Sequence, residues 1–110
     1  MADGIDTALM REAAAAGRIQ WHQHALERLL ERGISRAEVV QAILNGEVIE
    51  TYPKDYPCPS CLILSVEDGV PLHVVAAASP ADGVCHLVTA YRHTPTHFEP
   101  DFRTRRRRHE

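Results

Sequence analysis

The spacing of apolar residues changes abruptly at Gly46, and this change limits the fold more than any other feature of the chain. The segment before it has apolar residues at helical spacing and opens with a capping box formed by Ser35 and Glu38. The segment after it, Glu47–Tyr52, alternates polar and apolar side chains, which is typical of a half-buried strand. The pattern predicts helices followed by strands, and therefore an α+β protein.

The same reasoning divides the rest of the chain into elements. Predicted helices cover residues 7–16, 22–32 and 35–45, and predicted strands cover 47–52, 61–66, 72–78 and 85–92. Residues 18–21 are expected to form a short connection. The turns between the strands are short, so neighbouring strands are expected to pair antiparallel. The expected architecture is two or three N-terminal helices packed on one face of a four-stranded antiparallel sheet.

Length and composition indicate one domain with its own core. The chain has 110 residues, 45% of them hydrophobic, and we assign residues 1–102 to a single domain and 103–110 to a basic, disordered tail. No apolar run approaches the ~20 residues that cross a bilayer, and the N-terminus lacks a signal-peptide pattern, so no membrane association is expected. Three cysteines are a poor disulfide framework and favour the reducing cytoplasm.

Charge is distributed unevenly along the chain. The net charge is −3, but residues 103–110 carry a balance of +4 and the preceding residues a balance of −7. An acidic body is not the usual footprint of a nucleic-acid-binding protein. Any contact with RNA must therefore depend on local arginines and on the tail, with Arg105 and Arg106 as candidates. The tail is equally suited to an acidic protein partner.

The segment 21–32 is predicted to be an amphipathic helix with a distinctive polar face. Its apolar stripe consists of Ala25, Leu26, Leu29 and Leu30. On the opposite face, His24, Arg28 and Arg32 follow one another at intervals of four residues and so form one line. An imidazole beside two guanidinium groups suits a phosphate-handling surface. The same line also suits a solvated face, on which the arginines pair with Glu27 and Glu31.

Several motifs together resemble the bacterial domain of unknown function 4258 family. They are His24-Ala25-x-Glu27-Arg28, Glu31-Arg32-Gly33-Ile34-Ser35, Gly46–Glu50 followed by Tyr52-Pro53, Pro59-Ser60 with Leu62–Leu64, Leu72–Val75 and Thr89–Arg92. The resemblance covers about residues 18–103. It implies a fold similar to RelE/MqsR-like toxins, and a gene neighbour that encodes a small zinc-finger antitoxin.

This resemblance implies an endoribonuclease toxin of a type II toxin–antitoxin pair, which cleaves RNA without a metal or other cofactor. Such cleavage needs a base, an acid and cations for the phosphorane charge. His24 is the candidate base or acid, and Arg28 and Arg32 are candidate phosphate clamps. The candidate partners from the sheet are His73 and Tyr91 for catalysis and Arg92 for RNA binding. Each of the three also suits a structural role.

Two other functions fit the residues. The chain could be a non-catalytic protein-binding module that keeps the same fold. It could also be a small zinc-binding domain that uses Cys58 and Cys61, whose spacing fits half of a zinc site, with Cys85 and His86 as the remaining ligands. Ser60 is a further candidate for positioning a phosphate, although no nucleophile motif surrounds it.

Overall fold

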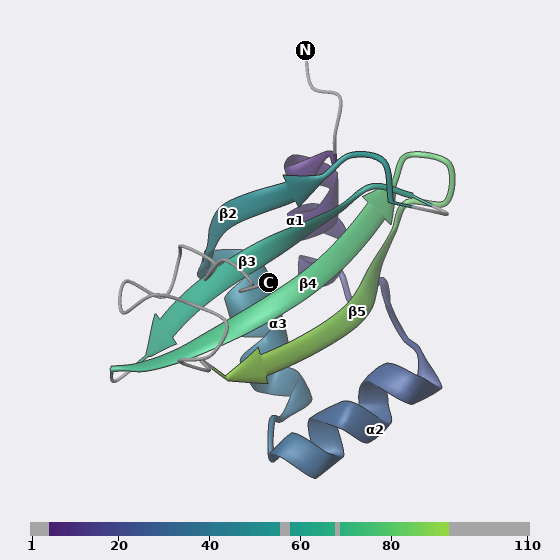
Figure 1. Ribbon diagram of the computed structural model, residues 1–110. Coiled ribbons are helices and arrows are strands. Elements are labelled where there is room, and N and C mark those ends of the chain that lie inside the picture. The colour runs from purple at the N-terminus through teal and green to yellow at the C-terminus, as the bar shows by residue number, and fades with distance from the viewer. Residues whose placement is uncertain (1–4, 56–57, 68, 93–110) are drawn as a thin grey trace, which may run out of the picture.

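A computed structural model of the protein describes residues 5–55, 58–67 and 69–92. The helices in these parts of the chain are α1 (Thr7–Ala15), α2 (Gln23–Arg32) and α3 (Arg36–Asn45). The strands are β1 (Ile19–Trp21), β2 (Glu47–Tyr52), β3 (Ser60–Glu67), β4 (Val70–Ser79) and β5 (Val84–Arg92). The strands form one sheet in the order β1-β5-β4-β3-β2 (Figure 1).

The sheet differs from the prediction in one strand. A four-stranded antiparallel sheet was expected, but the structure has five strands and a mixed sheet, because Ile19–Trp21 pairs parallel with β5. The segment was predicted to be a connection since three residues are too short to show a period. Ile19 and Trp21 pack against the core, and the amide of Cys85 donates to the carbonyl of Arg18 at 2.9 Å. These contacts make the segment a strand.

The other predicted elements are confirmed, with boundaries that shift by one or two residues. Ser35 Oγ accepts from the amide of Glu38 at 3.1 Å, and Glu38 Oε2 accepts from the amide of Ser35 at 3.2 Å, so the capping box is complete. Asp6 caps α1 through the amide of Leu9 at 3.0 Å. These local hydrogen bonds explain why the helix starts were readable from sequence.

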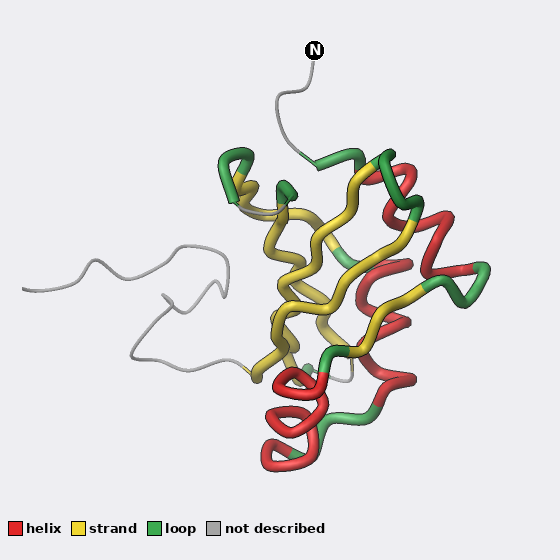
Figure 2. The backbone as a smooth tube through the Cα atoms, turned by 90° about the vertical axis from the view of Figure 1, so that its right-hand side faces the viewer, coloured by secondary structure: helices red, strands yellow, loops and turns green. Residues whose placement is uncertain are grey.

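Helices α1 and α3 form a layer on one face of the sheet, and α2 lies at the margin of the sheet. Helices α1 and α3 pack on each other and on the central strands, whereas α2 packs beside β5 (Figures 1 and 2). The core between the layers contains Met10, Ala13, Val39, Ile43, Cys61, Ile63, Val74, Ala76 and Leu87, among others. The prediction that Leu30 belongs to the buried stripe of α2 is wrong, since its side chain is 84% exposed. Because α2 lies at the margin of the sheet, its buried stripe is narrower than the helical spacing of its apolar residues predicts.

Alternation along the strands directs a second set of side chains to the face away from α1 and α3. Ser60 pairs in register with Ala77, and Ala77 pairs with His86, so these three residues form one row across β3, β4 and β5. Leu64, His73 and Tyr91 form another such row. The first row carries two polar side chains, Ser60 and His86, at one end of the sheet face.

Two predictions concern the ends of the chain and the membrane. The basic tail 103–110, and with it the domain boundary at 102, lies outside the described residues. Within the parts that are described, no helix has the length and apolar character needed to span a membrane.

Replacement of Gly46 by alanine is expected to destabilise the fold. An added Cβ would lie 2.5 Å from the carbonyl oxygen of Ala42, 2.6 Å from Ile63 Cγ2 and 2.8 Å from the carbonyl oxygen of Leu64. Because two of these atoms belong to the backbone, we expect Gly46→Ala to lower the free energy of unfolding by about 2 kcal/mol or more. Urea denaturation measures this loss in the free energy of unfolding. The control is Gly17→Ala, which meets no atom within 4 Å and carries only the strain of a positive φ, about 1 kcal/mol. Equal losses in the two variants would contradict the prediction.

The bond between Glu38 and Arg92 predicts a pH dependence of stability. The Arg92 guanidinium donates to Glu38 Oε1 at 2.9 Å and, together with the backbone amide of Ser35, holds the pKa of this carboxyl below its usual value of 4.5. A carboxyl with a lowered folded pKa stabilises the protein above its unfolded pKa, and this contribution disappears as the pH falls through the folded value. We therefore expect Glu38→Gln to cost up to about 1 kcal/mol at pH 7. The difference from the parent should vanish in acid. Denaturation curves from pH 7 to pH 3 test this, and a constant difference would contradict it.

Candidate functional site

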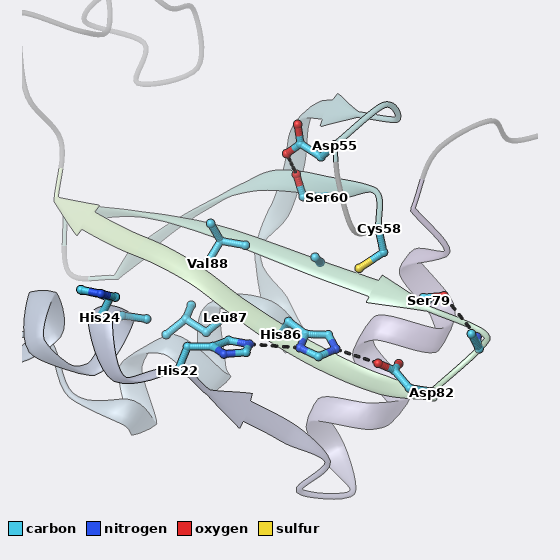
Figure 3. Close-up of a pocket in the computed structure, with 13 residues that line it drawn as sticks. His22, His24, Asp55, Cys58, Ser60, Ser79, Asp82, His86, Leu87 and Val88 are labelled. Atoms are coloured by element: carbon cyan, nitrogen blue, oxygen red, sulfur yellow. Dashed lines mark hydrogen bonds and ion pairs between the residues drawn. The ribbon is translucent and has the colours of Figure 1, made fainter.

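A pocket of about 570 Å³ opens on the sheet face away from α1 and α3, beside the N-terminus of α2. Such a volume suits a small-molecule or nucleotide ligand. Its polar lining comes from the start of α2, from the segment between β2 and β3, and from the strands and turn at one end of β4 and β5 (Figure 3). The polar side chains are His22, His24, Asp55, Cys58, Ser60, Ser79, Asp82 and His86. The lining that remains is apolar and includes Ala77, Leu87 and Val88.

A chain of three side chains crosses one side of this pocket. Asp82 Oδ2 lies 2.9 Å from His86 Nε2, and His86 Nδ1 lies 3.2 Å from His22 Nε2 (Figure 3). The two imidazole rings are stacked, with centroids 5.4 Å apart and planes 18° from parallel. The order carboxylate, imidazole, imidazole orients His86 from both sides. A carboxylate hydrogen-bonded to one ring nitrogen fixes the tautomer and the orientation of the ring.

Backbone pairing brings these three residues together. In the parallel pairing of β1 with β5, Gln20 is opposite His86 and Trp21 is opposite Leu87. His22 directly follows β1, so it enters the pocket beside the same strand. Asp82 lies in the turn that leads into β5, where the amide of Val84 donates to its Oδ1 at 3.0 Å. Each residue is therefore held by a backbone contact.

A β-bulge shapes the floor of the pocket. The pairing of β4 with β5 shifts register, so that Ala76 is opposite Leu87 and Val75 is opposite Thr89. Val88 is left without an opposite residue in this register, is 51% exposed and lines the pocket. Bulges are common next to active sites, where they redirect side chains.

The hydrogen bonds at Asp82 change its ionisation. Donation from His86, followed by donation from the amide of Val84, lowers the pKa of the Asp82 carboxyl. Asp82 is therefore an anion at neutral pH and a permanent acceptor for His86.

The N-terminus of α2 faces the same space. His22 is the N-cap residue of α2, and its side chain makes no capping hydrogen bond because it turns toward His86 instead. The first amides of a helix have no intrahelical partner and carry a partial positive charge. His24 and Ala25, in this first turn, line the pocket. The wall formed by α2 is therefore suited to an anionic group.

Comparison with protein-family models gives one match. Residues 21–92 match the model of a domain of unknown function (DUF4258). The chain belongs to the DUF4258 family. This confirms the family named from the sequence motifs. Searches of curated proteins and of solved structures found no match. The matched region of the DUF4258 domain contains every residue of the Asp82–His86–His22 chain.

The structure separates the three residues that sequence placed in one line on α2. His24 lies on the pocket wall, with its side chain 96% exposed and its Nδ1 3.8 Å from Glu27 Oε1. Arg28 pairs with Glu31 at 3.3 Å. Arg32 donates to the carbonyl of Ala90 at 2.8 Å and so joins the end of α2 to β5. Helix geometry places His24 and Arg32 about 12 Å apart along the axis, and only His24 reaches the pocket.

The candidates on the sheet also lie away from the pocket. His73 is fully buried and stacks on Tyr91, with ring centroids 5.4 Å apart. Arg92 donates to Glu38 and, at 3.2 Å, to the carbonyl of Gly33. It therefore connects β5 to α3 and to the segment between α2 and α3. The remaining candidates, Arg105 and Arg106, lie outside the described residues.

The cysteines of the DUF4258 domain point to different faces of the sheet. Cys58 lines the pocket, whereas Cys61 is fully buried in the core, where its Sγ lies 3.7 Å from Met10 Sδ. Burial raises the pKa of the Cys61 thiol to about 11 and that of Cys85, also in the core, to about 12. These two thiols stay protonated and are poor zinc ligands. Within the described ranges, no three His, Cys, Asp or Glu side chains gather as a metal site.

Sequence reasoning missed His22 and Asp82 and considered His86 only as a zinc ligand. Two weak signals could have found them. Ile19-Gln20-Trp21 alternates apolar and polar residues and ends directly at His22. Asp82 and His86 flank the start of a predicted strand, next to a turn that contains Gly83. Neither signal indicates that the two histidines meet.

Loss of His86 is expected to raise the pKa of Asp82. His86 is the main group that lowers this pKa, so His86→Ala should return the carboxyl toward the usual value of 3.8. The ¹³C chemical shift of the Asp82 carboxyl, followed through an acid titration, measures the pKa of this group. His22→Ala is the matched control, because it leaves His86 in place to donate to Asp82. An unchanged Asp82 titration in His86→Ala would show that this hydrogen bond is not formed in solution.

Proposed function

We propose that this DUF4258 protein is an endoribonuclease that cleaves RNA without a metal ion. The observation that supports the proposal is the hydrogen-bonded chain from Asp82 through His86 to His22 in an open pocket. Two imidazoles within hydrogen-bond distance supply the acid and the base that this reaction needs.

The reaction follows from the chemistry of the ribose-phosphate unit. A base removes the proton of the 2′-hydroxyl, and the 2′-oxygen forms a bond to phosphorus. The bond from phosphorus to the 5′-oxygen then breaks, and an acid gives that oxygen a proton. The products are a 2′,3′-cyclic phosphate and a 5′-hydroxyl, so atoms and charge balance without an added reactant.

The two histidines differ in environment, and this suggests their roles. Asp82 accepts from His86 Nε2 and orients the ring, so we assign His86 as the acid. His22 is exposed at the N-cap of α2, and no carboxylate in the described part of the chain bonds to its other ring nitrogen, so we assign it as the base. On binding, the substrate replaces the hydrogen bond between the two rings, so that His22 Nε2 faces the 2′-hydroxyl and His86 Nδ1 faces the 5′-oxygen.

In this mechanism the N-terminus of α2, rather than Arg28 and Arg32, stabilises the negative charge of the phosphorane. The phosphorane carries more negative charge than the substrate, and the first turn of α2, whose amides carry a partial positive charge, lines the pocket through His24 and Ala25. His24 lies on the same wall of the pocket, whereas Arg28 and Arg32 are not part of the lining. We therefore keep His24, but not the two arginines, as a residue near the substrate.

A role as a toxin of a type II toxin–antitoxin pair remains part of the proposal. It is supported by the family resemblance to RelE/MqsR-like toxins and by the helix-before-sheet architecture, which is a fold-level argument. A zinc-finger antitoxin would be the cognate partner on the same ground.

Cleavage of a single-stranded RNA oligonucleotide by the purified full chain tests the activity. We expect products with 2′,3′-cyclic phosphate ends, no effect of a chelator, and no cleavage of DNA of the same sequence, which lacks the 2′-hydroxyl. His86→Ala and His22→Ala should each lower the rate by about 100-fold or more. Gln41→Ala, on the exposed side of α3, is the control and should leave the rate unchanged.

The same variants separate this site from the one predicted on α2. Folded His86→Ala and His22→Ala variants that cleave as fast as the parent would refute the histidine pair. If Arg28→Ala alone abolished cleavage, the line of His24, Arg28 and Arg32 would be the active face. Growth arrest on induction, lost in His86→Ala, would connect the activity to the toxin role.

A further inference from the structure

A second polar pair lies across the pocket from the histidines. Ser60 is 1% exposed, and its Oγ donates to Asp55 Oδ2. Figure 3 shows Asp55 and Ser60 on one side of the pocket and His22 and His86 on the other, with Val88 between them. The proposed chemistry does not use this pair.

The row across the sheet sets the distance between the two sides. Ser60, Ala77 and His86 are in register on three adjacent strands. Neighbouring strands are about 4.8 Å apart, so Ser60 and His86 are about 10 Å apart across the sheet. A phosphate at His86 would place the base of the same nucleotide toward Asp55. The floor between the two sides is apolar, formed by Ala77 and Val88, and suits the face of a base.

The chemistry of Asp55 limits which base fits. An ionised carboxylate only accepts hydrogen bonds and has about four lone-pair directions. Ser60 occupies one of them and fixes the side chain, which leaves both oxygens able to accept from a ligand. Two adjacent donors occur on the Watson–Crick edge of guanine, at N1 and at the exocyclic amino group. The amino groups of adenine and cytosine are each next to an acceptor nitrogen, and the single donor of uracil is between two carbonyls.

We infer that Asp55, held by Ser60, is the specificity-determining residue of this pocket and selects guanine. The inference rests on the proposed function, because the phosphate at the histidine pair determines where the base lies. A bidentate pair between a side chain and a base discriminates by roughly tenfold to a hundredfold.

Calorimetric titration of the full chain with the four nucleoside 3′-monophosphates tests this without depending on cleavage. Guanosine 3′-monophosphate should bind roughly tenfold to a hundredfold more tightly than the other three. Asp55→Asn, which replaces one acceptor by a donor, should remove this preference. Ser60→Ala should reduce it, since the carboxylate is then no longer held. Glu12→Gln removes an exposed carboxylate from α1, on the other face of the sheet, and should leave all four affinities unchanged.

The outcomes separate the inference from the proposed function. Equal binding of the four nucleotides, no binding of any, or a guanine preference that survives in Asp55→Asn would each overturn the assignment of Asp55. If the four nucleotides bind equally but RNA is cleaved, only the base assignment fails. If guanosine 3′-monophosphate binds selectively through Asp55 but no RNA is cleaved, the nuclease proposal fails and guanine selection stands.

Discussion

The backbone pairing of β1 with β5 is the contact on which the candidate site depends. Only three residues pair, Ile19–Trp21, and the hydrogen bond from Cys85 to the carbonyl of Arg18 extends the pairing by one more contact. This pairing adds β1 as the edge strand of the sheet beside β5, and the chain continues from that edge into α2. His22 lies between β1 and α2, which explains why it is both the N-cap of the helix and a partner of His86. Without β1, the start of α2 would have no fixed position over the sheet.

Because side chains alternate along the strands, one face of the sheet packs into the core and the other lines the pocket. Cys61 and Cys85 point into the layer of α1 and α3, where burial keeps their thiols protonated. Their neighbours in sequence, Ser60 and His86, point to the opposite face and line the pocket. Cys58 precedes β3 and lines the pocket, whereas strand alternation turns Cys61 into the core, so the motif that looks like half of a zinc site is divided between pocket and core. The same rule makes Ser60, which is almost fully buried, available as a support for Asp55.

Much of the fold was predictable, and the exceptions have physical causes. The capping box at Ser35 and Glu38 is a local arrangement, so its residues alone predicted the start of α3. By contrast, β1 is shorter than any periodic pattern, and it exists because β5 offers a partner. Leu30 was expected to be buried because a helical wheel assumes a flat neighbour, whereas α2 packs on the margin of the sheet.

By itself the sequence determined the order of all helices and strands except β1, the family, and the presence of a histidine at the start of α2. These follow from short-range patterns, namely caps, turns and periodicity, and from contiguous motifs. Only the tertiary structure decided which polar side chains meet. His22 and His86 are 64 residues apart, and their contact depends on the register of a parallel strand pair that no local pattern encodes. The same holds for Arg32 and Arg92, whose guanidinium groups are engaged by backbone carbonyls that only the folded chain brings near.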